Sequence, residues 1–122
     1  MPGRVLIVED EMLIRMLAVD MLEELGFSAD EAGTAAEAMQ KLRASGADYA
    51  IILLDIGLPD KRGDDLIREV RQLNPGIPLL IASGESKADL QARLDGFAPI
   101  GYLGKPYDQD QMRDALGMLN VT

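Results

Sequence analysis

The chain has 122 residues, a length close to the commonest size of a single domain. Its 12 Lys and Arg against 21 Asp and Glu give a net charge of −9, the wrong sign for attracting a nucleic-acid backbone or an anionic membrane surface. The sequence has no Cys and no His, which excludes disulfides, thiol nucleophiles, Ser-His-Asp catalysis and most zinc sites. The reactive groups that remain available for a functional site are mainly carboxylates.

Apolar periodicity divides the chain into alternating strands and helices. We expect, in chain order, strand 5–8, a helix through 14–25, strand 27–31, a helix from 34 to 46, strand 50–54, a helix through 66–73, strand 77–82, a short helix from 86 to 95, strand 100–103 and a helix from 108 through 119. Gly26 is a natural end for the first helix. Capping boxes are expected at Thr34 to Glu37 and at Ser86 to Asp89, and an N-cap at Asp108.

These elements predict one α/β domain. Most of the expected strands are short, nearly continuous apolar runs, which is typical of a parallel sheet covered by helices on both faces. The predicted fold is therefore a doubly wound sheet. The seven Met residues are interpreted as core filler and not as a ligand surface.

The ends of the chain bear on its location. Met1 leads into an apolar strand without the basic region, the long apolar region and the cleavage site of a signal peptide. No apolar stretch is long enough to span a bilayer. The expectation is a cytoplasmic protein that binds neither membrane nor nucleic acid.

Polar residues follow four of the expected strands. In an open parallel sheet the binding site lies beyond the carboxyl ends of the strands, where this sequence has Glu9, Asp10, Asp55, Ser83 and Lys105. Acidic groups brought together from two strands repel one another unless a cation intervenes. An oxygen-only site without His or Cys suits Mg²⁺. The sequence therefore predicts a magnesium site at this edge.

Asp55 is the candidate nucleophile among these carboxylates. It follows the most apolar strand and precedes a turn, 56–59, that would expose it. A carboxylate can attack phosphorus to form an aspartyl phosphate, and a metal, Lys105 and the hydroxyl of Ser83 would then stabilise the phosphoryl oxygens.

In its motifs the chain resembles the receiver domains of two-component response regulators over essentially its whole length, residues 1–122. The matching segments are Val8-Glu9-Asp10-Glu11, Leu54-Asp55 with Pro59 and Gly63, Ala82-Ser83-Gly84, and Gly104-Lys105-Pro106. The resemblance implies a CheY-like, flavodoxin-like sheet of five strands in the order 2-1-3-4-5, flanked by five helices. It also implies a signalling switch rather than a conventional enzyme.

The resemblance assigns roles to individual residues. Asp55 would accept a phosphoryl group from a sensor histidine kinase or a histidine phosphotransfer protein. The magnesium ligands would be Glu9, Asp10, Asp55 and the backbone carbonyl of Gly57. Ser83 and Lys105 would bind phosphoryl oxygens.

The resemblance also implies how the signal leaves the site. Ser83 and the aromatic Tyr102 would move together on phosphorylation and change the surface of the fourth helix, fifth strand and fifth helix, shifting a population between two packings. The bond between Lys105 and Pro106 is expected to be cis.

Some loop residues depart from the pattern of relatives. Gly57 lacks the side chain that many relatives carry there, and Glu85 adds a negative charge near Ser83. Lys61 and Arg62 form a basic spot that either orients a kinase or balances nearby acidic residues.

Three functions remain open at this point. The leading interpretation is a stand-alone receiver that controls a downstream protein as a monomer or weak homodimer, because few residues follow the last helix. The second is the terminal receiver of a hybrid histidine kinase or a phosphorelay intermediate. The third is an aspartate-based phosphohydrolase, which Gly57 disfavours because such enzymes usually place a second Asp at that position.

Overall fold

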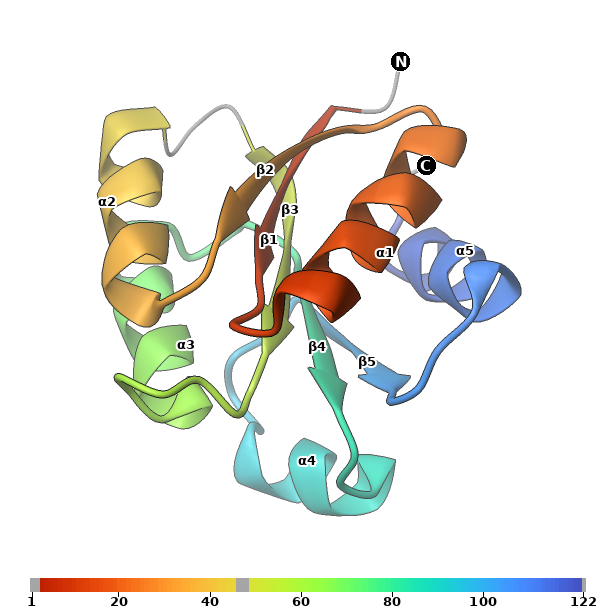
Figure 1. Cartoon of the computed structure of the whole chain (residues 1–122). Helices are drawn as coiled ribbons and strands as arrows, with labels where there is room; N and C mark the ends of the chain where they lie inside the picture. Colours follow the sequence, from red (N-terminus) through yellow and green to blue (C-terminus); the bar gives the residue numbers. More distant parts are fainter. Residues whose placement is uncertain (1–2, 46–48, 122) are drawn as a thin grey trace.

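The computed structural model describes residues 3–45 and 49–121 (Figure 1). Within this part of the chain the strands are β1 (Arg4–Val8), β2 (Ser28–Ala32), β3 (Tyr49–Asp55), β4 (Leu79–Ser83) and β5 (Ile100–Gly104). The helices are α1 (Met12–Glu24), α2 (Ala35–Ser45), α3 (Gly63–Leu73), α4 (Lys87–Arg93) and α5 (Gln109–Met118). The strands form one parallel sheet in the order β2-β1-β3-β4-β5, which confirms the predicted doubly wound fold.

Helices cover both faces of the sheet (Figure 1). Helices α1 and α5 pack on one face, and α2, α3 and α4 pack on the other. Alternate residues of β1 supply the two cores, because Val5 and Ile7 belong to the first and Leu6 and Val8 to the second. All four side chains are at most 1% exposed. Burying each contributes about 1.5–3 kcal/mol relative to leaving it in water.

The predicted element types are confirmed, and several boundaries differ. Strand β4 begins at Leu79, two residues later than expected. The reason is local, because Ile77 donates its N–H to the Asn74 side chain at 3.1 Å and Pro78 has no N–H to donate. The predicted end of the second helix at Gly46 lies outside the described residues.

The N-cap predicted at Asp108 forms, and each of the two predicted capping boxes forms the hydrogen bond to its Ser or Thr hydroxyl. Asp108 and Gln111 make a reciprocal capping box at α5, and the Ser86 hydroxyl accepts from Asp89 N at α4. At α2, Glu37 N donates to the hydroxyl of Thr34, but the Glu37 carboxylate accepts from Gly33 N. The expected box is thus displaced by one residue.

The interpretation of the methionines as core filler is wrong for three of them. Met12, Met16 and Met118 are 63%, 54% and 79% exposed. Helix α1 buries only Ala18 and Leu22, in its second half, so its first turns carry apolar side chains into solvent. Over residues 3–45 and 49–121, no helix has the length and apolar character required to cross a membrane.

Candidate functional site

The carboxyl ends of the strands bring the predicted polar residues to one edge of the sheet. In the register, Val8 of β1 lies beside Leu54 of β3, and Ser83 of β4 lies beside Gly104 of β5. The residues that follow these positions therefore face the same crevice. Between β1 and β3 the chain order reverses, which is where open α/β sheets bind their ligands.

Three carboxylates form the acidic part of this crevice. Each of Glu9, Asp10 and Asp55 offers an oxygen, and these oxygens lie within 4.8 Å of one another. Glu9 and Asp55 are only 4% and 7% exposed, whereas Asp10 is exposed. Burying two carboxylates beside a third costs free energy unless positive charge is supplied. The oxygen-only donor set fits a hard divalent cation such as Mg²⁺.

Lys105 supplies one positive charge to this cluster. Its Nζ lies 3.0 Å from Glu9 Oε1 and 3.1 Å from Asp55 Oδ1. Burial lowers the pKa of Lys105, but the hydrogen bonds to Glu9 and Asp55 outweigh it, and the net shift of the pKa is upward. One ammonium against three carboxylates leaves a formal excess of two negative charges, which a divalent cation would balance.

Burial is the main reason why Glu9 resists ionisation. It raises the pKa of Glu9 from 4.5 to about 6, with a smaller contribution in the same direction from the charge of Asp55. Hydrogen bonds from Glu11 N and from Lys105 oppose the shift without cancelling it. In the absence of a metal, the ionised form of Glu9 is therefore less stable in the folded protein than in the unfolded chain.

This shift predicts how Glu9 affects stability as the pH changes. Because the folded protein holds the proton more tightly, the Glu9 contribution to the free energy of unfolding is fully present below pH 4.5 and is lost as the pH rises through about 6. In a chelating buffer, Glu9→Gln should gain about 1–2 kcal/mol relative to the parent between pH 4.5 and pH 7. Urea unfolding at the two pH values measures this gain. An equal difference at both would contradict the prediction.

The other predicted residues lie around the acidic cluster. Gly57 N is 3.4 Å from Asp55 Oδ1, so the turn after β3 folds back beside the carboxylate. Ser83 is 3% exposed, and its hydroxyl accepts from Glu85 N at 3.0 Å. Tyr102 is half-buried on β5, and both Tyr102 and Ser83 line a cavity of about 80 Å³. The peptide bond between Lys105 and Pro106 is cis.

The loop between β3 and α3 is held by contacts that the sequence did not reveal. The carboxylate of Asp60 accepts from Ala35 N and Ala36 N, at 2.9 and 3.0 Å, and so caps helix α2. These two hydrogen bonds hold the pKa of Asp60 below its ordinary value. Lys61 pairs with Glu69 of α3. The loop beside Asp55 is thereby tied to two helices.

Both residues of the basic pair contact acidic side chains nearby. Arg62 Nη2 lies 4.0 Å from Asp64 Oδ2, and Lys61 is engaged by Glu69. The charges of Glu69 and Asp64 are thus partly balanced by the basic pair. Asp60 caps α2, and the charge of Lys61 adds to the two backbone hydrogen bonds of this cap in lowering the pKa of Asp60.

Comparisons with known proteins identify the family. Residues 5–117 match the response regulator receiver domain. Over 108 residues the chain is 32% identical to the sensor kinase CckA of Brucella abortus, covering 88% of this chain and 11% of that protein. It is 33% identical over 118 residues to the two-component response regulator PhoP of Pseudomonas aeruginosa, covering 95% of this chain and 51% of PhoP.

Solved structures share the fold. The chemotaxis protein CheY4 of Vibrio cholerae superposes with a TM-score of 0.87 at 22% identity, covering 98% of this chain and 99% of CheY4. The crevice with its acidic cluster thus belongs to a CheY-like α/β sheet. The chain belongs to the response regulator receiver domain family, whose members are signalling modules of two-component systems and not conventional enzymes. The chain spans about a tenth of the length of CckA and about half of the length of PhoP.

Proposed function

We propose that Asp55 accepts a phosphoryl group from the phosphorylated histidine of a sensor kinase or of a histidine phosphotransfer protein. An oxygen of the ionised carboxylate attacks phosphorus, the new P–O bond forms as the P–N bond breaks, and the imidazole nitrogen takes the electron pair and a proton. The observation that carries the proposal is the place of Asp55, which is nearly buried at the end of β3 and touches Lys105 within an acidic cluster.

The surrounding residues would bind the metal ion and the phosphoryl oxygens. Glu9, Asp10, Asp55 and the carbonyl of Gly57 would hold Mg²⁺, which supplies positive charge to the phosphoryl oxygens when it is bound. Lys105 already donates a hydrogen bond to Asp55. After transfer it would donate to an oxygen of the phosphoryl group on Asp55. Ser83 would donate its hydroxyl hydrogen to another phosphoryl oxygen.

We place the docking of the phosphodonor on the exposed side of α1. Four apolar side chains of this helix, Met12, Leu13, Met16 and Leu17, are between 50% and 69% exposed. Beside them a cavity of about 330 Å³ is lined by Ile14, Leu17, Met21, Lys105, Pro106 and Tyr107. An apolar surface that begins at the active-site lysine can seat a helix of the donor and bring its histidine to Asp55.

The output would arise on the opposite side of the crevice. Attraction of Ser83 to the phosphoryl group would let Tyr102 turn into the cavity of about 80 Å³ that both residues line. The surface of α4, β5 and α5 would then change and bind or release a downstream protein. We take residues 1–122 as one receiver domain, in keeping with the family match over 5–117.

A specific observation favours a second form of this function. The 32% identity to the sensor kinase CckA favours a receiver of a hybrid histidine kinase or a phosphorelay intermediate. A relay intermediate passes its phosphoryl group back to a histidine of a phosphotransfer protein. Incubating the phosphorylated chain with candidate phosphotransfer proteins from the same genome tests the relay form, which predicts transfer of the phosphoryl group to a histidine of the partner.

Intact-mass spectrometry tests the proposal. The parent chain is incubated with Mg²⁺ and phosphoramidate, a small phosphodonor, and should gain the mass of one phosphoryl group. Asp55→Asn should gain none, whereas the control Asp114→Asn, which removes an exposed carboxylate of α5, should behave as the parent does. An unmodified parent chain, or an equal adduct on Asp55→Asn, would contradict the proposal.

A further inference from the structure

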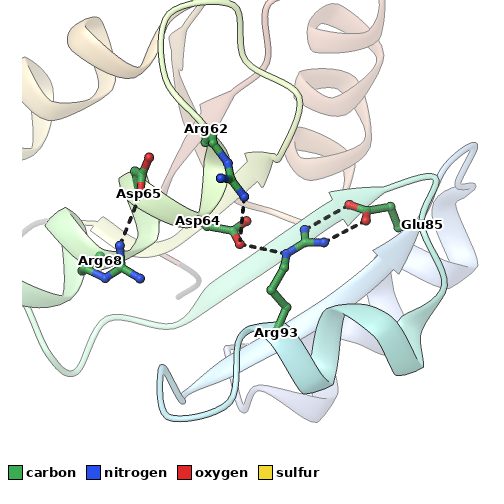
Figure 2. Close-up of polar contacts among 6 residues, drawn as sticks. All are labelled: Arg62, Asp64, Asp65, Arg68, Glu85 and Arg93. Carbon is green, nitrogen blue, oxygen red and sulfur yellow. Dashed lines mark hydrogen bonds and ion pairs between the residues drawn. The ribbon is translucent and has the colours of Figure 1, made fainter.

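The hydroxyl of Ser83 is engaged by the loop that follows it. Its oxygen accepts from the backbone N–H of Glu85 at 3.0 Å. The Glu85 carboxylate in turn accepts two hydrogen bonds from Arg93 of α4, from Nη1 at 2.8 Å and from Nη2 at 3.0 Å (Figure 2). The position of Ser83 is thus linked to a charged residue on a helix outside the acidic cluster.

Arg93 also reaches the neighbouring helix. Its Nε lies 2.8 Å from Asp64 Oδ2 in the first turn of α3, so one guanidinium joins the start of α3 to the loop between β4 and α4 (Figure 2). Those two segments follow the strands that end in Asp55 and Ser83. Arg93 therefore joins the loop after β4 to the first turn of the helix that follows β3.

The geometry of these contacts is better than that of an ordinary surface ion pair. Isolated exposed pairs are worth little because solvent screens them and ordering the side chains costs entropy. Here the Arg93–Glu85 contact is bidentate, and the third guanidinium nitrogen is used by Asp64. The Arg93 and Glu85 side chains are 36% and 44% exposed, and the Asp64 side chain is 17% exposed. The hydrogen bonds from Arg93 also hold the pKa of Glu85 below its ordinary value, so Glu85 is ionised at neutral pH.

We propose that Glu85, Arg93 and Asp64 form an electrostatic latch that holds the loop after β4, and with it Ser83, in the unphosphorylated position. The proposal rests on the function proposed above, in which Ser83 turns to a phosphoryl group on Asp55. The contacts of the latch form in the unphosphorylated state, and they must loosen when Ser83 moves in the phosphorylated state. It therefore biases the equilibrium against the phosphorylated arrangement and slows phosphorylation.

The consequence is a positioning role for Arg93, which acts on Ser83 through Glu85. Without the latch, the fraction of molecules with a mobile loop should rise about two- to fivefold. This is the change in population expected from losing one to two well-formed, partly exposed ion pairs. Phosphorylation by a small donor should accelerate by the same factor. Small donors need no docking surface, so the effect reports on the loop and not on partner binding.

The test compares three single variants and one double variant. Arg93→Ala removes the whole latch, and Glu85→Gln removes only the bidentate pair. Arg68→Ala is the matched control, because Arg68 pairs at 3.2 Å with Asp65 inside α3 (Figure 2) and its guanidinium lies over the ring of Phe97, after α4. Among the described residues it makes no hydrogen bond or ion pair with the loop between β4 and α4. The double variant Glu85→Gln/Arg93→Ala tests whether the two residues act through each other.

Two readouts separate the latch from the proposed function. Amide hydrogen exchange at Glu85, measured by NMR without metal or donor, reports the loop alone. The rate of adduct formation with phosphoramidate and Mg²⁺ reports the reaction. We expect Arg93→Ala to raise both rates by about two- to fivefold, with a smaller rise for Glu85→Gln, no change for Arg68→Ala, and no further gain in the double variant.

The outcomes decide between the alternatives. An unchanged exchange rate at Glu85 in Arg93→Ala would overturn the latch, whatever happens to phosphorylation. Faster exchange with an unchanged phosphorylation rate would overturn its role in the reaction, as would strictly additive effects in the double variant. If the parent and all variants remain unphosphorylated, the proposed function fails, and the exchange rates still decide whether the latch holds the loop.

Discussion

Saturating Mg²⁺ should raise the free energy of unfolding of the unphosphorylated protein by about 2–3 kcal/mol, the gain expected at about 100 times the dissociation constant. The reason is the excess of negative charge among Glu9, Asp10 and Asp55, of which only one charge is balanced by Lys105. The folded protein assembles these ligands from two strands, and the unfolded chain does not. Denaturant unfolding with and without Mg²⁺ at neutral pH measures the difference.

Two variants test whether the stabilisation by Mg²⁺ arises from binding in the crevice. Asp10→Asn should lose most of the gain, because it removes the exposed carboxylate of the cluster without disturbing the contacts of Lys105. The control Asp20→Asn removes a charge from the exposed side of α1 and should keep the gain. The metal site would be refuted by a parent protein whose unfolding midpoint does not move, or by an equal gain in Asp10→Asn.

Gly63→Ala should destabilise the protein by about 2–4 kcal/mol. Gly63 opens α3 directly behind the loop that follows Asp55. A Cβ placed there would lie 2.3 Å from Ile56 Cγ1 and 2.8 and 2.9 Å from the Cα and O of Ile56. Two of these atoms are backbone, so a rotamer change cannot relieve the contact. The turn beside Asp55 would have to shift, and phosphorylation should slow as well.

Gly117→Ala is the matched comparison. A Cβ at Gly117 of α5 meets nothing within 4 Å, so the substitution should stabilise the helix by about 0.5–1 kcal/mol through the lower entropy of the unfolded chain. Thermal unfolding of the two variants beside the parent provides the measurement. If Gly63→Ala were as stable as Gly117→Ala, the close approach of α3 to Ile56 would be wrong.

The fold and the acidic cluster could be predicted because their signals are local. Apolar runs mark the strands, and the residues that follow a parallel strand lie at one edge of the sheet whatever the details of packing. That is why Glu9, Asp10 and Asp55 were expected together, and the structure brings them within 4.8 Å. Lys105 followed from the same rule, and its contacts to two of the three agree with it.

The side-chain contacts around the crevice could not be predicted from local sequence patterns. Asp60 caps a helix that begins 25 residues earlier in the chain, so no pattern around it announces the partner. Arg93 has a helical spacing that is equally compatible with a solvated surface residue. Its contacts depend on where the packing of the core places α4 relative to the first turn of α3. Glu85 was noticed only as a nearby negative charge, since its partner lies eight residues away.

The apolar surface of α1 was missed for a related reason. Composition and periodicity give Met12 and Met16 the same hydrophobic character as a core residue, and only the placement of the helix decides which side is covered. Because α1 packs through Ala18 and Leu22, its first turns remain open beside Lys105. An exposed apolar patch next to a charged crevice is better explained by a partner than by the core.

Chemical localisation of the phosphoryl group tests the central claim most directly. The protein is phosphorylated by a small donor in the presence of Mg²⁺ and reduced with borohydride, which converts an aspartyl phosphate to homoserine, and is then mapped by peptide mass spectrometry. We predict homoserine at position 55 and unmodified Glu9 and Asp10. Reduction at Asp10, a reduced product at Glu9, or an unmodified Asp55 in protein that carries a phosphoryl group would contradict the assignment of Asp55 as the phosphoacceptor.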